Sequence, residues 1–392
     1  MNSPATAENL HVHLPTPGDH YSPATGSALM TIIYELAREH QKRDGDSRII
    51  VGRGTRHDYP VGTAVEVDYG ALPSRRMKLA DAAMGRVGLP RHFSVSLYKP
   101  ARQAIERNLR GSIFLHNNPA FLPMLKRRCE AARVCLYLNN VVFRTYARRE
   151  IRRILDACDA AICVSDFIAD DLAFRAGGSS DKLVVVHNGV DTARFKPADP
   201  CPDGDPVVLF LGRVIPEKGP DLLLRAARKV VASGARPFKI RIVGSSGFSV
   251  TDALSPYEIE LRRLAEPIRE LVEFRPFADR AAIISEYGVA SIFCAPSNWD
   301  DPCPLTVLEG LACGLPTIAS RRGGIPEIGG DAAMYFRPPD VDELAQQLSH
   351  LLDDERARAE WGARARARAE TFSWSNQYGT LSAALDTARM AR

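Results

Sequence analysis

The sequence predicts an α/β protein built from two Rossmann-like domains. The chain has 392 residues, which is too long for one ordinary hydrophobic core and suits two domains. A strand, a glycine-bearing loop and a helix open each half, over 10–44 and again over 207–230. Polar side chains also gather at the ends of successive strands, a pattern typical of the ligand-binding edge of a parallel sheet.

The composition is that of a soluble globular protein. Hydrophobic residues make up 45% of the chain and charged residues 25%, and no apolar run is long enough to span a bilayer. The first 21 residues lack the basic and then apolar pattern of a signal peptide. None of the eight cysteines forms a Cys-x-x-Cys pair, and several stand in apolar, strand-like runs. These features predict reduced, buried thiols and a cytoplasmic protein.

Basic residues are concentrated in the first half of the chain. Residues 71–155 hold 18 Lys and Arg against four Asp and Glu, although the net charge of the whole chain is only +4. Such a surplus of basic residues is typical of a protein that binds an anionic acceptor or contacts an anionic membrane peripherally. It is equally typical of an ordinary solvated surface. Nucleic acid is not expected as a partner, because the basic runs lack interleaved aromatics or a known module.

The first half alternates between strands and helices. Strands are expected at 10–14, 48–54, 63–69, 112–116 and 134–140, and helices at 29–44, 102–109 and 120–132. A further helix should be capped by Ser165 or Asp166. Two strands of this half end in polar residues, His116-Asn117 and Asn139-Asn140, which makes these residues candidates for a site.

The second half repeats the pattern after a linker at 197–206, which is rich in Pro, Asp and Gly. Its most informative stretch is 291–327, where we expect a buried strand at 291–295, a helix at 305–313 and a strand at 316–320. Gly314 and Pro316 end the helix, and a Gly-Gly turn follows the last strand. Asp301 stands before this helix and Glu309 on it, so both carboxylates should lie near the carboxyl edge of the sheet.

Three segments resemble the signatures of one enzyme family, the retaining family-four (glycogen-synthase-like) glycosyltransferases. Segment 296–316 has the Pro-Ser, the Glu and the Gly-x-Pro of the donor-site motif, with Asp301 in place of the first Glu and Gly310 in place of Ala. Segment 212–219 matches the Gly-Arg…Lys-Gly motif, and 188–195 matches Asn-Gly-Val-Asp…Phe. The three segments stand in the family's order, and the resemblance covers roughly residues 110–330.

The resemblance implies the GT-B fold, in which two Rossmann-like domains face each other across a cleft. The acceptor-binding domain would comprise 1–196 and the nucleotide-sugar-binding domain 207–370. The last helix, 371–392, would pack back on the N-terminal domain.

The resemblance also implies an activity, the metal-independent transfer of a sugar from a nucleotide sugar to an acceptor hydroxyl with retention. The expected co-substrate is a UDP- or GDP-linked sugar, with no cofactor, and the acceptor is a small molecule, a saccharide or a lipid-linked intermediate in polysaccharide or secondary-metabolite synthesis. Two cations near a helix N-terminus can neutralise a departing diphosphate without a metal, which is the chemistry expected of Arg213 and Lys218.

Site residues follow from the matched positions. The residues expected in catalysis are His116, Arg213, Lys218 and Asp301. The residues expected to bind the donor are Gly26, Gly212, Gly244, Ser245, Phe277, Pro304, Leu305, Thr306 and Glu309. The residues expected on the acceptor side are Ser27, Asn117 and Asn139, and no metal ligands are expected.

Two other functions fit the same fold. A non-hydrolysing nucleotide-sugar epimerase shares the two domains, and a catalytically idle homologue could bind a nucleotide sugar, an alternative kept open by the Asp at position 301. A nicotinamide dehydrogenase is disfavoured, because no Gly-x-Gly-x-x-Gly follows the first strand of either half.

Overall fold

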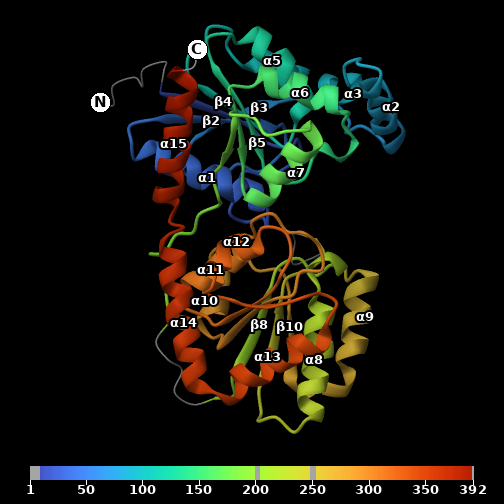
Figure 1. Ribbon diagram of the computed structural model, residues 1–392, viewed down its shortest axis with the longest axis vertical. Helices are drawn as coiled ribbons and strands as arrows, with labels where there is room; N and C mark the ends of the chain where they lie inside the picture. The colour runs from blue at the N-terminus through green and yellow to red at the C-terminus, as the bar shows by residue number, and fades with distance from the viewer. Residues whose placement is uncertain (1–8, 199–203, 248–252, 391–392) are drawn as a thin grey trace. The chain divides into compact units, whose positions relative to one another are not determined.

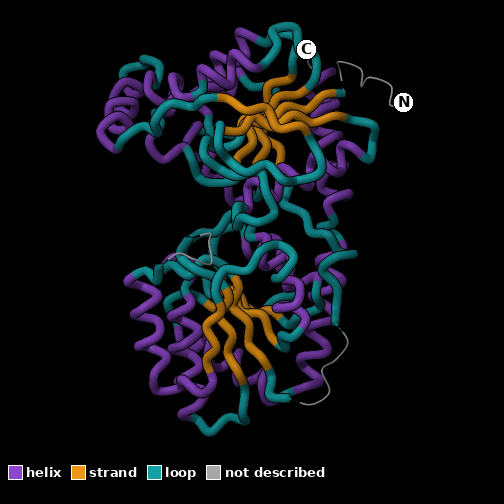
Figure 2. The backbone as a smooth tube through the Cα atoms, turned by 180° about the vertical axis from the view of Figure 1, so that it is seen from behind, coloured by secondary structure: helices purple, strands orange, loops and turns teal. Residues whose placement is uncertain are grey.

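The computed structural model describes residues 9–198, 204–247 and 253–390, so residues 199–203 of the linker expected at 197–206 lie outside the described residues. The chain forms two compact units. Unit 1 comprises residues 1–22, 27–187 and 374–392, and unit 2 comprises residues 23–26 and 188–373. Each unit has one parallel sheet flanked by helices (Figures 1 and 2), which confirms the predicted α/β fold.

Unit 1 has a seven-stranded sheet with the order β3-β2-β1-β4-β5-β6-β7. The strands are β1 (Leu10–Leu14), β2 (Asp46–Gly52), β3 (Thr63–Val67), β4 (Ser112–His116), β5 (Arg133–Leu138), β6 (Ala160–Cys163) and β7 (Leu183–Val185). The helices are α1 (Ala28–Gln41), α2 (Arg75–Arg86), α3 (His92–Leu97), α4 (Lys99–Ala104), α5 (Leu122–Arg128), α6 (Arg148–Ala157), α7 (Asp166–Ala176) and α15 (Trp374–Met390). The final helix α15 packs on α1 and β5 of this unit.

Unit 2 has a six-stranded sheet with the order β10-β9-β8-β11-β12-β13. The strands are β8 (Val207–Leu211), β9 (Lys239–Val243), β10 (Val272–Arg275), β11 (Ile292–Ala295), β12 (Thr317–Ser320) and β13 (Met334–Phe336). The helices are α8 (Pro220–Ala232), α9 (Pro256–Ala265), α10 (Ile283–Gly288), α11 (Leu305–Ala312), α12 (Ile325–Gly329), α13 (Val341–Asp353) and α14 (Glu355–Glu370).

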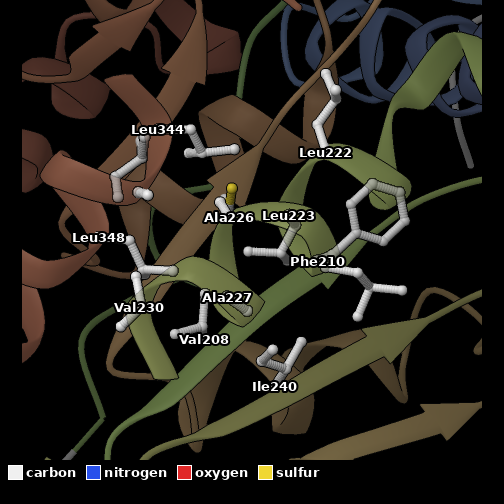
Figure 3. Packing of buried hydrophobic residues seen from close by; sticks show 14 of the residues in the cluster. Val208, Phe210, Leu222, Leu223, Ala226, Ala227, Val230, Ile240, Leu344 and Leu348 are labelled. Atoms are coloured by element: carbon white, nitrogen blue, oxygen red, sulfur yellow. The ribbon is translucent and has the colours of Figure 1, made fainter. Parts of the chain in front are cut away.

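The core of unit 2 forms where helices α8 and α13 pack on the sheet. Leu223 and Ala227 of α8 meet Leu344 and Leu348 of α13 above Val208 of the central strand (Figure 3). These residues recur at helical spacing on each helix, so both apolar stripes are buried in one layer. The central strand and the start of α8 are thereby fixed, and the loop between them carries candidate site residues.

The structure corrects two helix boundaries in unit 1. The helix expected at 102–109 begins earlier, because Pro100 occupies the first turn of α4, and it ends at Ala104. The helix expected at 120–132 ends at Arg128, where Cys129 takes a non-helical conformation. The predicted cap is confirmed, since the Ser165 hydroxyl accepts a hydrogen bond from the amide of Ile168.

The segment 188–195 groups with unit 2, whereas the sequence placed it at the end of the N-terminal domain. Its contacts explain the grouping. The amide of Val190 donates to the carbonyl of Phe372, and the Arg366 guanidinium donates to the carbonyls of Thr192 and Phe195. The division therefore falls between residues 187 and 188.

The described cysteines are unpaired and buried, as predicted for reduced thiols, and Cys201 lies outside the described residues. Among the described helices, none is both long and apolar enough to cross a membrane.

Candidate functional site

In each sheet, one pair of neighbouring strands marks the point where the strand order reverses. In unit 2 this pair is β8 and β11, and in unit 1 it is β1 and β4. Open α/β sheets bind ligands outside the carboxyl ends of the strands at such a point. The predicted residues Arg213, Lys218 and Asp301 all lie in the loops that follow β8 and β11.

Two glycines allow the backbone at the end of β8 to contact the backbone at the end of the neighbouring strand β9. Gly212 and Gly244 both adopt positive φ, at 152° and 135°. A Cβ atom on Gly244 would lie 2.0 Å from the carbonyl oxygen of Gly212, a distance no side chain tolerates. The ends of β8 and β9 are therefore in close backbone contact, which requires glycine at Gly244.

The loop after β8 is held against the end of β11. Gly219 has a φ of +67°, and a Cβ there would lie 2.0 Å from the carbonyl oxygen of Pro296. The amide of Asn298 donates to the carbonyl of Glu217 at 2.8 Å. This close packing explains why Lys218 is followed by glycine, and it fixes Lys218 beside the β11 loop.

Lys218 and Asp301 form an ion pair, so the structure brings together two of the four residues expected in catalysis. The Asp301 side chain is almost fully buried, and its carbonyl accepts the amide of Gly324 at 2.9 Å. Gly323 has the positive φ expected for the Gly-Gly turn, whereas Gly324 does not. Arg213 is exposed and forms no ion pair within the described parts of the chain.

Helix α11 presents free backbone amides at the carboxyl edge of the unit 2 sheet, the edge that also carries the β8 and β11 loops. It begins at Leu305, after Pro304, which has no N–H group. Among the described residues, the amides of Leu305 and Thr306 make no hydrogen bond, whereas the amide of Val307 already donates to Pro304. Two unpaired amides at a helix N-terminus favour an anion or a polar hydroxyl oxygen.

Glu309 lies in the interior of unit 2 with both carboxylate oxygens engaged. Its Oε1 accepts from Arg280 at 2.5 Å and its Oε2 from the hydroxyl of Tyr287 at 3.1 Å. Only 2% of the Glu309 side chain is exposed. Burial, together with the nearby Glu309 charge, raises the pKa of Tyr287 well above its ordinary value, so this hydroxyl stays protonated and donates.

The sequence did not identify Arg280 or Tyr287 as partners of Glu309. Arg280 stands in the loop after β10 and Tyr287 on α10, 29 and 22 residues before Glu309. No local motif marks either residue.

Two further donor-side candidates occupy neighbouring loops. The carbonyl of Ser245 accepts the amide of Val214 at 2.9 Å, and its hydroxyl donates to Gly247. Phe277 is half-buried in the loop after β10. Their roles toward a donor stay predictions.

In unit 1, the predicted acceptor-side residues also lie near the point of strand reversal. Gly26, which was predicted on the donor side, is exposed and groups with unit 2, although it immediately precedes Ser27 of unit 1. Ser27 caps helix α1 by accepting the amide of Met30 at 3.3 Å, so its hydroxyl is already in use. Asn117 adopts a φ of 55° at the end of β4, and its Oδ1 accepts the amide of Asn139 at 2.8 Å.

His116 is completely buried, and both of its ring nitrogens have partners. Nδ1 accepts from the side-chain amide of Asn139 at 3.3 Å, which leaves Nε2 to donate to Nδ1 of His13 at 3.1 Å. The sequence missed His13, although the alternation in His-Val-His marks two histidines on one face of β1. From its buried position, His116 thus fixes the orientation of the Asn139 side-chain amide. A contact between His116 and a substrate stays a prediction.

Four buried histidines line this part of unit 1, namely His11, His13, His40 and His116. Burial lowers the pKa of each, to about 3 for His13 and well below the ordinary value for His11 and His116. The neutral rings therefore have to take up protons when the unit unfolds in acid.

We expect unit 1 to lose stability as the pH falls below about 6.5, where unfolded histidine begins to bind a proton. Each fully buried histidine adds a slope of about 1.4 kcal/mol per pH unit, so His11, His13 and His116 together give about 4 kcal/mol per unit. Urea titrations followed by circular dichroism at pH 7.5, 6.5 and 5.5 measure this slope. The exposed His350, replaced by Gln, is the matched control. A urea midpoint that stays constant between pH 6.5 and 5.5 would contradict the assignment of neutral rings.

Two family models match the chain, one after the other. Residues 30–194 match Glycosyltransferase Family 4, and residues 191–368 match Glycosyl transferases group 1. Together these models span most of the sequence.

Curated relatives point to the same family. The chain is 26% identical over 278 residues to spore coat protein SA of Bacillus subtilis, covering 66% of this chain and 73% of the relative. It is 32% identical over 248 residues to a GDP-mannose-dependent monoacylated alpha-(1-6)-phosphatidylinositol monomannoside mannosyltransferase of Corynebacterium glutamicum, covering 58% and 62%. A D-inositol 3-phosphate glycosyltransferase 2 of Catenulispora acidiphila is 31% identical, covering 57% and 55%. The second and third matches span less than two thirds of these relatives' own length.

Solved structures share the fold over nearly the whole chain. A glycosyltransferase from Rickettsia africae superposes with a TM-score of 0.73 at 16% identity, covering 97% of this chain and 98% of that one. HepE of Anabaena, in complex with UDP and glucose, superposes with a TM-score of 0.70 at 17% identity, covering 97% and 100%. With the two parallel sheets, the matched motifs and these comparisons together, the chain belongs to the family-four glycosyltransferases of the GT-B type.

Proposed function

We propose that this protein is a retaining, metal-independent glycosyltransferase that moves a sugar from a nucleotide sugar to an acceptor hydroxyl. One observation carries the proposal. Arg213, the Lys218–Asp301 pair and the free amides of α11 all lie in the two loops beside the strand reversal of unit 2.

The diphosphate of the donor would bind to the cations of the β8 loop. Arg213 is exposed and has no carboxylate partner among the described residues, so its guanidinium can bind two phosphate oxygens at once. The close packing of Gly219 against Pro296 fixes Lys218. A pre-positioned cation stabilises the charge that develops on a leaving diphosphate more than it stabilises the bound donor, and this difference is what accelerates the reaction.

The sugar and the ribose would bind to the α11 segment. Asp301 sits beside Lys218 and can accept a sugar hydroxyl, while the amides of Leu305 and Thr306 donate to the sugar or its phosphate. Glu309 would accept the ribose hydroxyls. A carboxylate oxygen offers two acceptor positions, so the bonds from Arg280 and Tyr287 leave one on each oxygen.

The acceptor would meet the strand ends of unit 1. Asn117 and Asn139 are half-buried there, next to one another, and offer amide groups to a hydroxyl. His116 lies beneath them and fixes the Asn139 amide, which makes it a positioning residue.

The reaction would proceed on one face of the sugar. The acceptor oxygen forms a bond to the anomeric carbon as the bond from that carbon to the phosphate oxygen breaks. The departing phosphate takes the acceptor proton, so no protein base is needed and the configuration is retained. The role of the protein is to hold both partners and to neutralise the diphosphate.

The activity is tested by incubating the protein with UDP-, GDP-, ADP- and TDP-sugars, with and without polyol, saccharide and lipid-linked acceptors, in the presence of EDTA. We expect release of one nucleoside diphosphate and a product whose anomeric proton coupling matches that of the donor. An isomerised nucleotide sugar formed without acceptor would instead support the epimerase. Complete inertness toward every donor would support the idle homologue.

We also propose that residues 72–89 contact an anionic membrane where a lipid-linked acceptor would lie. Four large apolar side chains are 55–74% exposed here, among basic residues without ion pairs in the described parts of the chain. The apolar residues are Leu72, Leu79, Val87 and Leu89, and the exposed basic residues are Arg75, Arg76, Lys78 and Arg86. Apolar groups and cations gathered on helix α2 (Arg75–Arg86) and the residues that flank it favour an anionic bilayer surface.

We expect the protein to sediment with vesicles containing phosphatidylglycerol and to stay in solution with pure phosphatidylcholine. Replacing Arg75, Arg76 and Lys78 by Gln should weaken the binding by about 100-fold, since each cation contributes on the order of 1 kcal/mol near an anionic surface. A triple Gln variant of Arg356, Arg358 and Arg364 on α14 provides the control. Equal sedimentation of both variants would contradict a role for this segment.

A further inference from the structure

A cavity in unit 1 lies where the strands of the sheet begin, at the opposite edge from the strand ends that carry His116, Asn117 and Asn139. It has a volume of about 270 Å³, close to the lower end of the range for small-molecule sites. Its walls come from the beginnings of β1 and β5, the end of α1 and the final helix α15, on which α1 packs. The residues that line it include His11, His40, Arg43, Arg133, Tyr378, Ser382 and Asp386.

His11 is a buried polar side chain that makes ring contacts but no hydrogen bond with another described residue. Only 5% of it is exposed, and within the described residues its ring makes no hydrogen bond. It stacks on His40 with ring centroids 3.5 Å apart and planes within 3°. The ring nitrogens of His11 are not fully enclosed, so they can bond to water or to a ligand in the cavity.

The neighbouring His40 has a fixed tautomer. Its Nε2 must donate to the carbonyl of Asn9, at 3.1 Å, and its Nδ1 therefore accepts from the hydroxyl of Tyr378, at 2.6 Å. His40 is thus satisfied inside the protein. The groups left to meet a ligand are His11 and the two arginines.

The charges on the cavity wall favour an anion. Arg43 and Arg133 form no ion pair among the described residues, and each donates only to backbone carbonyls, at 3.3–3.5 Å. Arg43 also stacks over the Tyr378 ring at 4.4 Å. Among the described residues of the lining, Asp386 is the one carboxylate, so these residues carry a net positive charge before any histidine is protonated.

We propose that this cavity is a binding site for a small phosphate monoester, with Arg133 and Arg43 holding the phosphate and His11 donating to it. Guanidinium groups match phosphate oxygens bidentately, and an adjacent imidazolium completes a set of donors around a dianion. The Tyr378 ring and Leu385 supply the apolar wall for a short organic tail. The site is separate from the donor and acceptor residues of the proposed transferase.

Binding should depend on pH. Burial, the neighbouring rings of His40 and His13, and the charge of Arg133 all lower the pKa of His11 and favour its neutral form. A dianion bound in contact with the ring would favour the protonated form instead, because its charge is opposite. The other charged groups around the stack are Arg43, Arg133, Asp46, Glu39 and Asp386. Phosphate binding should therefore take up a proton and tighten as the pH falls from 8 to 6.5.

The test is calorimetry with glycerol 3-phosphate, inorganic phosphate and sulfate, at pH 8 and 6.5 and in two buffers of different ionisation enthalpy. We expect Arg133→Gln to weaken binding of the phosphates at least tenfold and to abolish the proton uptake. The exposed Arg127→Gln is the matched control and should leave both unchanged. Glycerol 3-phosphate binding more tightly than inorganic phosphate would support a monoester, whereas equal binding of sulfate and phosphate would overturn that assignment.

Phosphate could also reach the cations of unit 2, so two more variants separate the sites. Arg213→Gln should leave the proton-coupled binding intact. Ser382→Phe should fill the cavity without removing a charged group. It replaces Arg133→Gln as the test variant if Arg133→Gln proves less stable than wild type, as judged by its unfolding temperature in chloride buffer without phosphate. Proton-coupled binding that survives both Arg133→Gln and Ser382→Phe, or that disappears in Arg213→Gln, would overturn the proposal.

Discussion

Replacing Lys218 by methionine should lower kcat by about 100- to 1000-fold, the usual effect of removing one group that stabilises a developing negative charge. Methionine keeps much of the length of the lysine stem and removes only the ammonium group. The expected change is in kcat more than in KM, because the diphosphate gains charge as the bond to the sugar breaks. Steady-state kinetics on the donor identified by the activity screen measures both constants.

The Lys218 variant also leaves Asp301 without its partner. Removing one member of a buried ion pair costs stability, and here Asp301 is the more buried member. Lys229→Met is the matched control, since Lys229 also pairs with a carboxylate, Asp342, but on an exposed face of unit 2. Urea unfolding of both variants separates lost folding from lost chemistry. A folded Lys218→Met enzyme with an unchanged kcat would contradict the role of this cation.

Replacing Glu309 by glutamine should weaken nucleotide binding by about 10- to 100-fold, because hydrogen bonds to a charged group contribute about 1.5–3 kcal/mol each. Glutamine retains the shape and one acceptor oxygen. Alanine would be a poorer choice, since it would leave the Arg280 guanidinium and the Tyr287 hydroxyl without their partner in the interior.

A comparison with Arg280→Met separates binding from stability. Both variants break the Arg280–Glu309 pair, but only Glu309→Gln removes the carboxylate expected to bind the ribose. We expect similar losses of thermal stability in the two variants and a large loss of nucleotide affinity only in Glu309→Gln. Nucleotide affinity that is the same in Glu309→Gln and wild type would remove Glu309 from the donor site.

The elements around Asp301 and Glu309 could be predicted from the sequence because local signals determine them. Pro296 ends a buried strand, Gly314 and Pro316 end the helix, and the structure places β11, α11 and β12 within one residue of the expected bounds. Gly212 at the end of β8 and Gly244 at the end of β9 were likewise predicted as donor-site residues. Their steric reason, the contact between Gly212 and Gly244, appears only when β8 and β9 lie side by side.

The pairings inside each site could not be predicted in the same way. His13 and His116 are 103 residues apart and meet only because β1 and β4 are neighbours where the strand order reverses. Arg280 reaches Glu309 from a loop with no regular pattern. The sequence also suggested an accessible His116, whereas its ring is enclosed by His13, Tyr137 and Asn139. Such contacts depend on tertiary packing, which the local pattern does not encode.

The most direct test of the donor site in unit 2 is calorimetry of the wild-type protein and of Arg213→Gln with UDP, GDP, ADP and TDP. We predict that one nucleotide binds clearly more tightly than the other three, and that Arg213→Gln weakens this binding at least tenfold. If none of the four binds to the folded wild-type protein, the cations and amides of these loops do not form a donor site, and the proposed transferase activity is contradicted.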